Sequence, residues 1–218
     1  MTRPAALVFD LDGTLIDSRR DITTALNRMR AEVALPPLEL EQVVTMVGEG
    51  ARLLVERAMG PECPPERVDQ ALARYLEHYW GVCLETTHPY PGVAEMLAEL
   101  GSRYPLALLS NKGEALSRKI LEGLGLAGRF REILGGDTLP TRKPDPAGLH
   151  RLAERLDVPV ESLVLVGDAW VDAETARNAG CRFALVEWGF PRPPNLDGIQ
   201  ADFRAADAAE LVGALGLD

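Results

Sequence analysis

Short apolar runs alternate with helix-like segments over much of the chain. The runs are apolar at nearly every position, which is typical of parallel strands covered on both faces. The predicted strands are Ala5–Phe9, Leu106–Leu109, Leu163–Val166 and Phe183–Val186, with a weaker candidate at Glu132–Gly136. The helices predicted between the later strands are Glu114–Leu124, Pro146–Leu156 and Ala173–Ala179. This alternation predicts an α/β fold, in which a parallel sheet lies between two layers of helices.

The stretch between the first two strands has a different pattern, which is helical throughout. Proline- and glycine-containing breaks divide it into four segments. These predicted helices are Asp21–Val33, Leu38–Val47, Glu49–Met59 and Pro65–Val82. A block of this length is too large for a simple crossover between strands. We therefore expect a helical insert that folds over the carboxyl edge of the sheet.

The expected domain boundaries follow from this insert. Residues 1–17 and 88–218 would form the core, and residues 18–87 would form the insert. We expect hinges near Ile16–Ser18 and Thr86–Tyr90, where the chain crosses between the two parts. The aromatic residues Tyr75, Tyr79 and Trp80 have helical spacing, which favours packing inside the insert over contact with a ligand.

Length and charge limit the classes of partner. A chain of 218 residues suits one domain, or one domain with an insertion. The net charge of -10 argues against a nucleic-acid or anionic-membrane surface. No apolar run approaches the ~20 residues that span a bilayer, and the N-terminus lacks the pattern of a secretory signal. The cysteines, Cys63, Cys83 and Cys181, are odd in number and suit a reducing compartment. We expect a cytoplasmic monomer or homodimer.

The segment Asp10-Leu11-Asp12-Gly13-Thr14 carries the first candidate chemistry. It places two carboxylates directly after an apolar strand, and Gly13 permits the turn by which the chain leaves the sheet. Carboxylates this close repel each other, and a hard cation such as Mg²⁺ relieves that repulsion. A surface turn is the alternative interpretation of this segment, because Asp and Gly are common turn residues.

Further polar side chains follow the other predicted strands. Ligands of open α/β sheets bind beyond the carboxyl ends of the strands, so we expect these side chains to meet there. Ser110, Asn111 and Lys112 follow the second strand, Asp168 and Asp172 follow the Leu163–Val166 strand, and Lys143 precedes a helix marked by proline. A negative chain can still bind an anion at such a site, because its overall field decays within about 8 Å at physiological salt.

These segments resemble the motifs of a known family. DLDGT, LLSNK, KPDP and GDAWVD are similar, in order, to the four motifs of the haloacid dehalogenase superfamily of phosphohydrolases. The resemblance covers nearly the whole chain and is strongest to the phosphoglycolate phosphatase-like group. It implies a Rossmannoid three-layer core and an α-helical cap domain inserted after the first strand.

The resemblance also implies a role for each carboxylate. Asp10 would be the nucleophile that forms an aspartyl-phosphate, and Asp12 would protonate the leaving alkoxide and then activate water. The first step requires a proton on Asp12, which the nearby charge of Asp10 favours. Mg²⁺ would be held by the Asp10 carboxylate, the Asp12 main-chain carbonyl and Asp168, with Asp172 supporting Asp168 or a metal-bound water.

Ser110, Asn111 and Lys143 would bind the phosphoryl group, and Lys143 would also offset the charge of Asp10. Structural alternatives are open for three of the site residues, and for Lys143 the alternative is a solvated surface lysine. Ser110 is also a suitable helix N-cap, and Asp172 is a suitable cap for the helix predicted to begin near Ala173.

The best single prediction for the substrate is 2-phosphoglycolate. Backbone amides in Gly48–Arg52, with the Arg52 side chain, would receive its carboxylate, and Lys112 would add a second positive charge. Alternatively, Arg52 and Lys112 are solvated and the Gly-Glu-Gly turn only joins two helices.

Several alternative functions stay open. They are a sugar-phosphate phosphatase, a β-phosphoglucomutase-like phosphomutase, and a non-enzymatic phospho-aspartate signalling or binding module. A dehalogenase is disfavoured, because family members of that type lack the aspartate found here as Asp12. A signalling receiver domain is shorter and has no use for the helical insert.

Overall fold

The computed structural model describes residues 3–190 and 198–216. Its centre is a six-stranded sheet in the order β5-β4-β1-β6-β7-β8, with every neighbouring pair parallel. The first strand along the chain therefore lies in the middle, between β4 and β6. The strands are β1 (Ala6–Phe9), β4 (Leu106–Leu109), β5 (Glu132–Leu134), β6 (Leu163–Gly167), β7 (Arg182–Val186) and β8 (Phe203–Ala205). The predicted parallel sheet is confirmed.

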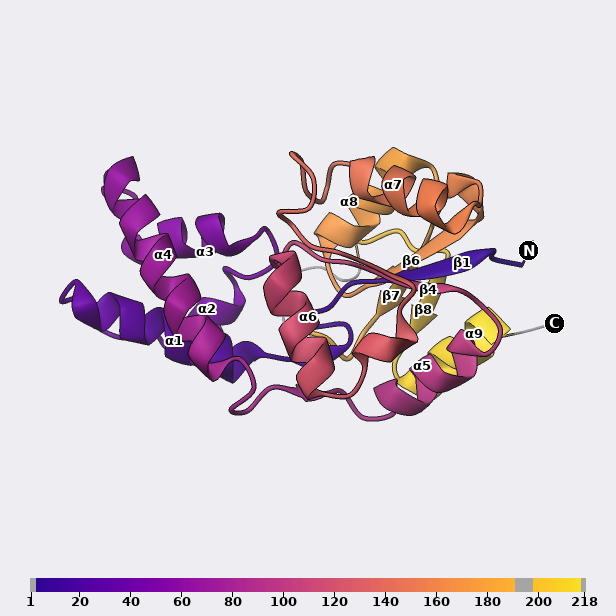
Figure 1. Ribbon diagram of the computed structural model, residues 1–218, viewed down its shortest axis with the longest axis horizontal. Coiled ribbons are helices and arrows are strands. Elements are labelled where there is room, and N and C mark those ends of the chain that lie inside the picture. The colour runs from indigo at the N-terminus through magenta and orange to yellow at the C-terminus, as the bar shows by residue number, and fades with distance from the viewer. Residues whose placement is uncertain (1–2, 191–197, 217–218) are drawn as a thin grey trace.

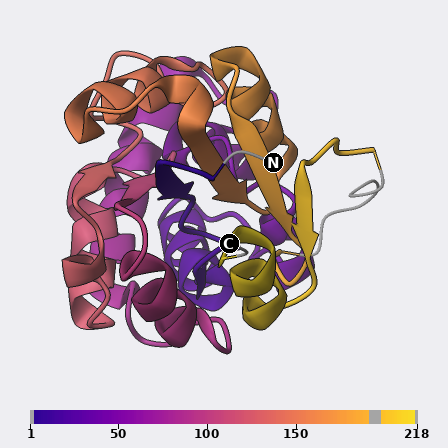
Figure 2. The ribbon, with the colours of Figure 1, turned by 90° about the vertical axis from the view of Figure 1, so that its right-hand side faces the viewer.

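Helices cover both faces of this sheet, which gives the three layers visible in Figures 1 and 2. One face carries α7 (Ala147–Leu156) and α8 (Trp170–Ala179), and the other carries α5 (Val93–Gly101), α6 (Glu114–Gly123) and α9 (Ala208–Gly216). Strand β1 shows why both layers are needed. Leu7 and Phe9 belong to the apolar cluster on the α5 and α9 side, whereas Ala6 and Val8 belong to the cluster under α7 and α8. All four are fully buried, as the side-chain alternation of a central strand requires.

The helical insert lies beyond one edge of the sheet, at the left of Figure 1. It consists of α1 (Arg19–Glu32), α2 (Leu40–Val44), α3 (Ala51–Met59) and α4 (Pro65–Val82). These helices pack on a shared apolar interior that includes Leu26, Met29 and Tyr79. We call them the cap. Tyr75 and Tyr79 are buried and their rings stack at 5.7 Å, as predicted. The prediction of a buried position was wrong for Trp80, which is 48% exposed.

Two short strands join the cap to the core. β2 (Ile16–Asp17) and β3 (His88–Pro89) pair in antiparallel fashion, so the outgoing and returning connections lie side by side. The Asp21 carboxylate of α1 fastens the returning connection. It accepts hydrogen bonds from the backbone N–H and the hydroxyl of both Thr86 and Thr87, at 2.6 to 3.0 Å. The hinge segments predicted from the sequence coincide with this paired region.

Several elements were not predicted from the sequence. Helix α5 was missed although its buried residues, Val93, Met96, Leu97 and Leu100, have clear helical spacing. Helix α9 was missed, and so were the short strands β2, β3 and β8. Strand β8 pairs only with β7, and just one of its residues is buried. Helix α8 begins at Trp170 and not near Ala173, because the Asp172 carboxylate accepts the Ala169 N–H at 3.2 Å and so closes its first turn.

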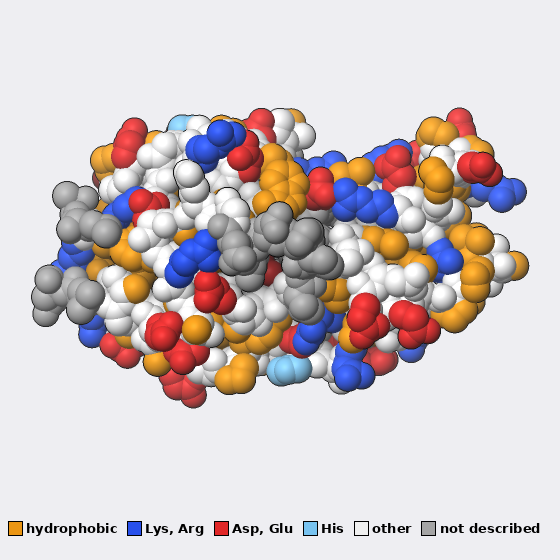
Figure 3. Space-filling model, turned by 180° about the vertical axis from the view of Figure 1, so that it is seen from behind, with side chains coloured by type: hydrophobic (Ala, Val, Ile, Leu, Met, Phe, Trp, Pro, Cys, Tyr) orange, Lys and Arg blue, Asp and Glu red, His pale blue; other side chains and the backbone are white. Residues whose placement is uncertain are grey.

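Acidic and basic side chains are interspersed over the face seen in Figure 3, so the net negative charge is not gathered there. Among the described residues, no helix is long and apolar enough to cross a membrane.

Candidate active site

A pocket of about 60 Å³ lies between the carboxyl edge of the sheet and the cap. The core supplies its polar wall from the ends of β1 and β4, and the cap supplies an apolar wall from α3 and α4. The polar wall consists of Asp10, Asp12, Ser110, Asn111 and Lys112, and the apolar wall includes Leu54, Tyr75, Leu76 and Tyr79. Strands β4 and β5 lie on one side of β1, and β6, β7 and β8 lie on the other. Ligands of α/β folds bind beyond the strand ends at such a point, which is where this pocket lies.

Asp10 occupies the centre of the site. It follows β1, and its backbone N–H donates to the Val166 carbonyl at 2.9 Å, which ties it to the end of β6. The ammonium of Lys143 lies 2.8 Å from the Asp10 carboxylate and 2.6 Å from that of Asp172. Burial raises the pKa of Asp10, the Asp172 charge raises it further, and Lys143 acts in the opposite direction. The predicted pairing of Lys143 with Asp10 is therefore present in the structure.

Lys143 itself is held as a cation. Its side chain is only 2% exposed. Burial lowers the pKa of this ammonium, but the adjacent charges of Asp10 and Asp172 outweigh burial and raise the pKa above its ordinary value. A buried lysine between two carboxylates keeps its charge. A charged lysine can donate strong hydrogen bonds to the oxygens of a phosphoryl group.

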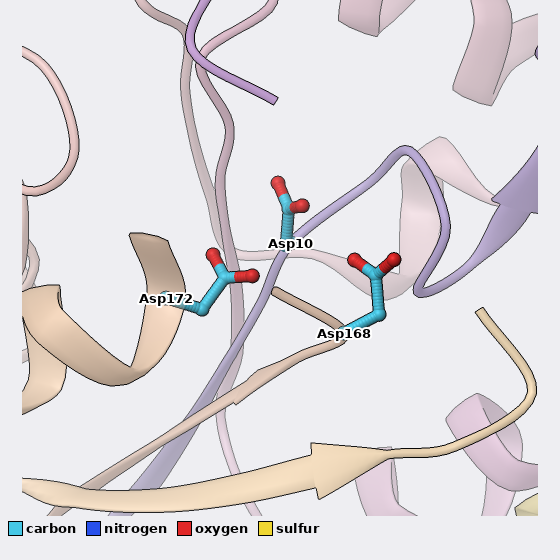
Figure 4. A group of neighbouring side chains, drawn as sticks. All are labelled: Asp10, Asp168 and Asp172. Carbon is cyan, nitrogen blue, oxygen red and sulfur yellow. The ribbon is translucent and has the colours of Figure 1, made fainter. Parts of the chain in front are cut away.

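Three aspartates converge beside this lysine. Asp10, Asp168 and Asp172 each offer a carboxylate oxygen, and these oxygens lie within 4.8 Å of one another. Figure 4 shows Asp10 after β1, Asp168 after β6 and Asp172 on the first turn of α8. Asp168 is oriented by the Phe190 N–H at 3.2 Å and the Thr14 hydroxyl at 3.4 Å.

Gly13 passes so close to Asp168 that any side chain at position 13 would collide with this carboxylate. Its positive φ of 86° adds a second reason for glycine there.

The carboxylates fit a hard divalent cation such as Mg²⁺, which prefers oxygen ligands. The three carboxylates are not equally suited to bind this cation. Asp172 is fully buried, and one of its oxygens accepts a hydrogen bond from the Lys143 ammonium while the other accepts the Ala169 N–H. Asp168 accepts hydrogen bonds from the Phe190 N–H and the Thr14 hydroxyl. This arrangement suits Asp10 and Asp168 as ligands and Asp172 as a support that acts through Lys143.

Ser110 and Asn111 follow β4. Ser110 is not the N-cap of α6, because that helix begins at Glu114 and its N-cap is Gly113. The hydroxyl oxygen of Ser110 accepts the Lys112 N–H at 3.3 Å and lines the pocket. The Asn111 side-chain amide donates to the carbonyls of Gly48 and Lys143, each at 3.0 Å. Both amide hydrogens are thus used, so the Asn111 side chain supports the Lys143 segment and the cap loop and does not point a donor at the phosphate position.

Asp12 lies at the cap side of the site. Its carboxylate accepts a hydrogen bond from the Ser18 hydroxyl and pairs with Lys112 at 2.8 Å. The Lys112 ammonium also donates to the Tyr79 hydroxyl of α4 at 2.6 Å. From the sequence, Ser18 was predicted only as the end of a hinge, and Tyr79 only as a packing residue. The available signal for Tyr79 was that a buried tyrosine hydroxyl needs a polar partner.

Arg52 does not face the pocket. Its guanidinium pairs with Asp69 of α4 on the outside of the cap, where the arginine side chain is 42% exposed. The residues just before Arg52 do line the pocket, at Gly48, Gly50 and Ala51. The structure therefore brings Lys112 into the site and leaves the Arg52 side chain outside it.

Comparisons with known proteins agree with this geometry. The chain matches the model of the haloacid dehalogenase-like hydrolases over residues 7–186. It is 41% identical over 199 residues to the phosphoglycolate phosphatase of Rhodospirillum rubrum, with 88% of this chain and 83% of that protein covered. It is 42% identical over 196 residues to the phosphoglycolate phosphatase of Cereibacter sphaeroides, with 88% of each covered.

The same likeness holds in three dimensions. The crystal structure of a predicted phosphoglycolate phosphatase from Haemophilus somnus superposes with a TM-score of 0.92 at 28% identity. That comparison covers 98% of this chain and 99% of the other. The chain belongs to the haloacid dehalogenase-like hydrolase family.

Proposed function

We propose that this protein is a cytoplasmic, Mg²⁺-dependent phosphatase that hydrolyses 2-phosphoglycolate through an aspartyl-phosphate on Asp10. The observation that carries the proposal is the placement of Asp10, with Lys143 at 2.8 Å and the carboxylates of Asp168 and Asp172 beside it. The relatives that cover most of the chain are phosphoglycolate phosphatases, which supports the choice of substrate.

Asp10 begins the reaction by attacking phosphorus with a carboxylate oxygen. The new O–P bond forms as the bond from phosphorus to the ester oxygen breaks, and the leaving alkoxide takes a proton from Asp12. A water molecule then transfers one of its own protons to the Asp12 carboxylate and attacks the same phosphorus, and the bond between phosphorus and the Asp10 oxygen breaks. This step releases inorganic phosphate and restores the Asp10 carboxylate.

Electrostatics explain why Asp10 needs its neighbours. A buried carboxylate repels a phosphate dianion, and burial also raises the pKa of Asp10, which favours its unreactive acid form. Lys143 offsets both effects, because its ammonium stabilises the carboxylate and attracts the phosphoryl oxygens. Bound Mg²⁺, held by Asp10 and Asp168, would supply further positive charge toward the phosphate.

The size of the pocket favours a small substrate. A volume of about 60 Å³ and an apolar cap wall leave little room behind the phosphate position. A small ester such as 2-phosphoglycolate suits this pocket, and the substrate panel described next compares it directly with a sugar phosphate.

A panel of phosphate monoesters tests the proposal. The purified protein with Mg²⁺ should give its highest kcat/KM with 2-phosphoglycolate, above glucose 6-phosphate, nucleoside monophosphates and p-nitrophenyl phosphate. A chelator should abolish turnover. A hexose phosphate or nucleotide with the highest kcat/KM would disprove the substrate, and turnover of no ester would disprove the enzyme class.

A further inference from the structure

We propose that Lys112, fixed between Asp12 and the cap residue Tyr79, is the residue that binds the carboxylate of the substrate. The inference rests on the proposed function and assigns the specificity of its site. The positive charge that binds the substrate carboxylate then belongs to the core, and the Tyr79 hydroxyl of the cap helps to hold it in place.

The Lys112 side chain is positioned from two sides. It is 7% exposed, its Nζ lies 2.8 Å from the Asp12 carboxylate and 2.6 Å from the Tyr79 hydroxyl, and it lies 4.6 Å from the centre of the Tyr79 ring. An ammonium has three N–H donors, and these two hydrogen bonds use two of them. Since Lys112 lines the pocket, the third donor is available for a ligand there.

The charge of the pocket shows why this donor matters. The described lining holds two carboxylates, Asp10 and Asp12, and Lys112 is its one cation. Lys143 is not among the residues that line this pocket. Its ammonium lies between the carboxylates of Asp10 and Asp172, at the phosphoryl end of the site. An anionic tail entering the cap side would meet the Asp12 charge alone if Lys112 were absent. An uncharged tail gains nothing from Lys112.

The other candidate cation is Arg52, which lies on α3, directly after the glycine-rich loop of the cap. Its partner is Asp69, and it is not part of the pocket lining. The contact with Tyr79 also links Lys112 to the position of the cap. Because the tyrosine belongs to α4, the Lys112 donor is oriented for the carboxylate only while the cap lies over the core.

Binding of two inert analogues tests the proposal without turnover. 3-Phosphonopropionate has the shape of 2-phosphoglycolate and keeps its carboxylate, and propylphosphonate has an uncharged tail. The wild type should bind the first more tightly. Lys112→Met should weaken 3-phosphonopropionate by about 10- to 100-fold, as expected for a lost hydrogen bond to a charged group, and propylphosphonate by less than about threefold.

Two more variants keep the test decisive. Tyr79→Phe retains the ring under the ammonium but removes the hydroxyl, and it should cost 3-phosphonopropionate about three- to tenfold. Lys119→Met is the matched control. Lys119 lies 4.4 Å from the ring centre of Trp80, the neighbour of Tyr79, but it is outside the pocket lining. This control should change neither affinity.

The same variants should divide in turnover. Lys112→Met should lose far more kcat/KM on 2-phosphoglycolate than on ethyl phosphate. Equal losses on both esters would overturn the proposal, because Lys112 would then act only through Asp12. A selective loss in Arg52→Met would overturn it as well. In either case the wild type would still hydrolyse 2-phosphoglycolate, and only absence of that activity would remove the proposed function itself.

Discussion

Each of the two lysines of the site pairs with one carboxylate of the Asp10-Leu11-Asp12 segment, but the two lysines differ in the other residues that hold them. Each ammonium lies 2.8 Å from its aspartate, Lys143 from Asp10 and Lys112 from Asp12. Both partners of Lys143 belong to the core, whereas Lys112 also contacts Tyr79 of the cap. The charged contacts at the phosphoryl end thus come from the core. The opposite end depends on the packing of the cap, because Tyr79 belongs to α4.

The largest expected effect is at the centre of the phosphoryl end. Asp10→Asn should lower kcat about 10⁴-fold or more, because an amide is a poor nucleophile. The substitution changes little in volume, so the circular dichroism spectrum should match that of the wild type. Near-normal turnover by a folded Asp10→Asn variant would rule out covalent catalysis at this residue.

Lys143→Met should be the next most severe change, with a loss of about 10² to 10³-fold in kcat/KM. The loss should be similar for 2-phosphoglycolate and p-nitrophenyl phosphate, because every substrate presents the same phosphoryl group. Lys112→Met should instead discriminate between the two tails. If Lys143→Met also discriminated, the division of the site into two ends would be wrong.

The pH profile of Lys143→Met sharpens this point. Lys143 lowers the pKa of Asp10 against the effect of burial, so its removal should raise that pKa further. Asp10 then becomes ionised only at higher pH, and the acid limb of kcat/KM should move upward, measured at saturating Mg²⁺. An acid limb that stays in place would show that Lys143 does not control the ionisation of Asp10.

Asp12→Asn should have an effect that depends on the leaving group. With an alkyl ester the loss should be about 10² to 10³-fold, because the alkoxide no longer receives a proton. Formation of the phosphoenzyme from p-nitrophenyl phosphate should slow much less, since nitrophenolate leaves without one. Rapid-mixing bursts that slow equally with both esters would exclude Asp12 as the acid.

The smallest predicted effect is on stability, at the connection between cap and core. Burial raises the pKa of Asp21, but the hydrogen bonds from Thr86 and Thr87 outweigh it and leave the pKa below its ordinary value of 3.8. The stabilisation is therefore fully present above that ordinary value and is lost as pH falls through the lower pKa of the folded state.

Asp21→Asn should reduce the free energy of unfolding by about 1–3 kcal/mol at neutral pH. Urea unfolding of both proteins, repeated at decreasing pH, should show the two curves converging in acid. A difference that is constant with pH would contradict the role of the charge.

The sequence predicted the phosphoryl end well and the cap side poorly, for a physical reason. Asp10, Lys143 and Asp168 follow strands or precede a helix, so a local pattern and the rule for parallel sheets bring them together. The contacts of Lys112 with Tyr79 and of Arg52 with Asp69 depend on how the cap helices turn about their axes. A periodic pattern shows which helix face is buried, but not which polar atom on that face meets a distant lysine.

Chemical trapping of the phosphorylated residue tests the central claim most directly. The wild type would be mixed with 2-phosphoglycolate and Mg²⁺, quenched in acid within one turnover, and reduced with borohydride, which converts an aspartyl-phosphate to homoserine. Peptide mass spectrometry should find homoserine at position 10, and Asp10→Asn should give none. Homoserine at position 12 or 168, or no homoserine while phosphate is released, would contradict a mechanism in which Asp10 carries the phosphoryl group.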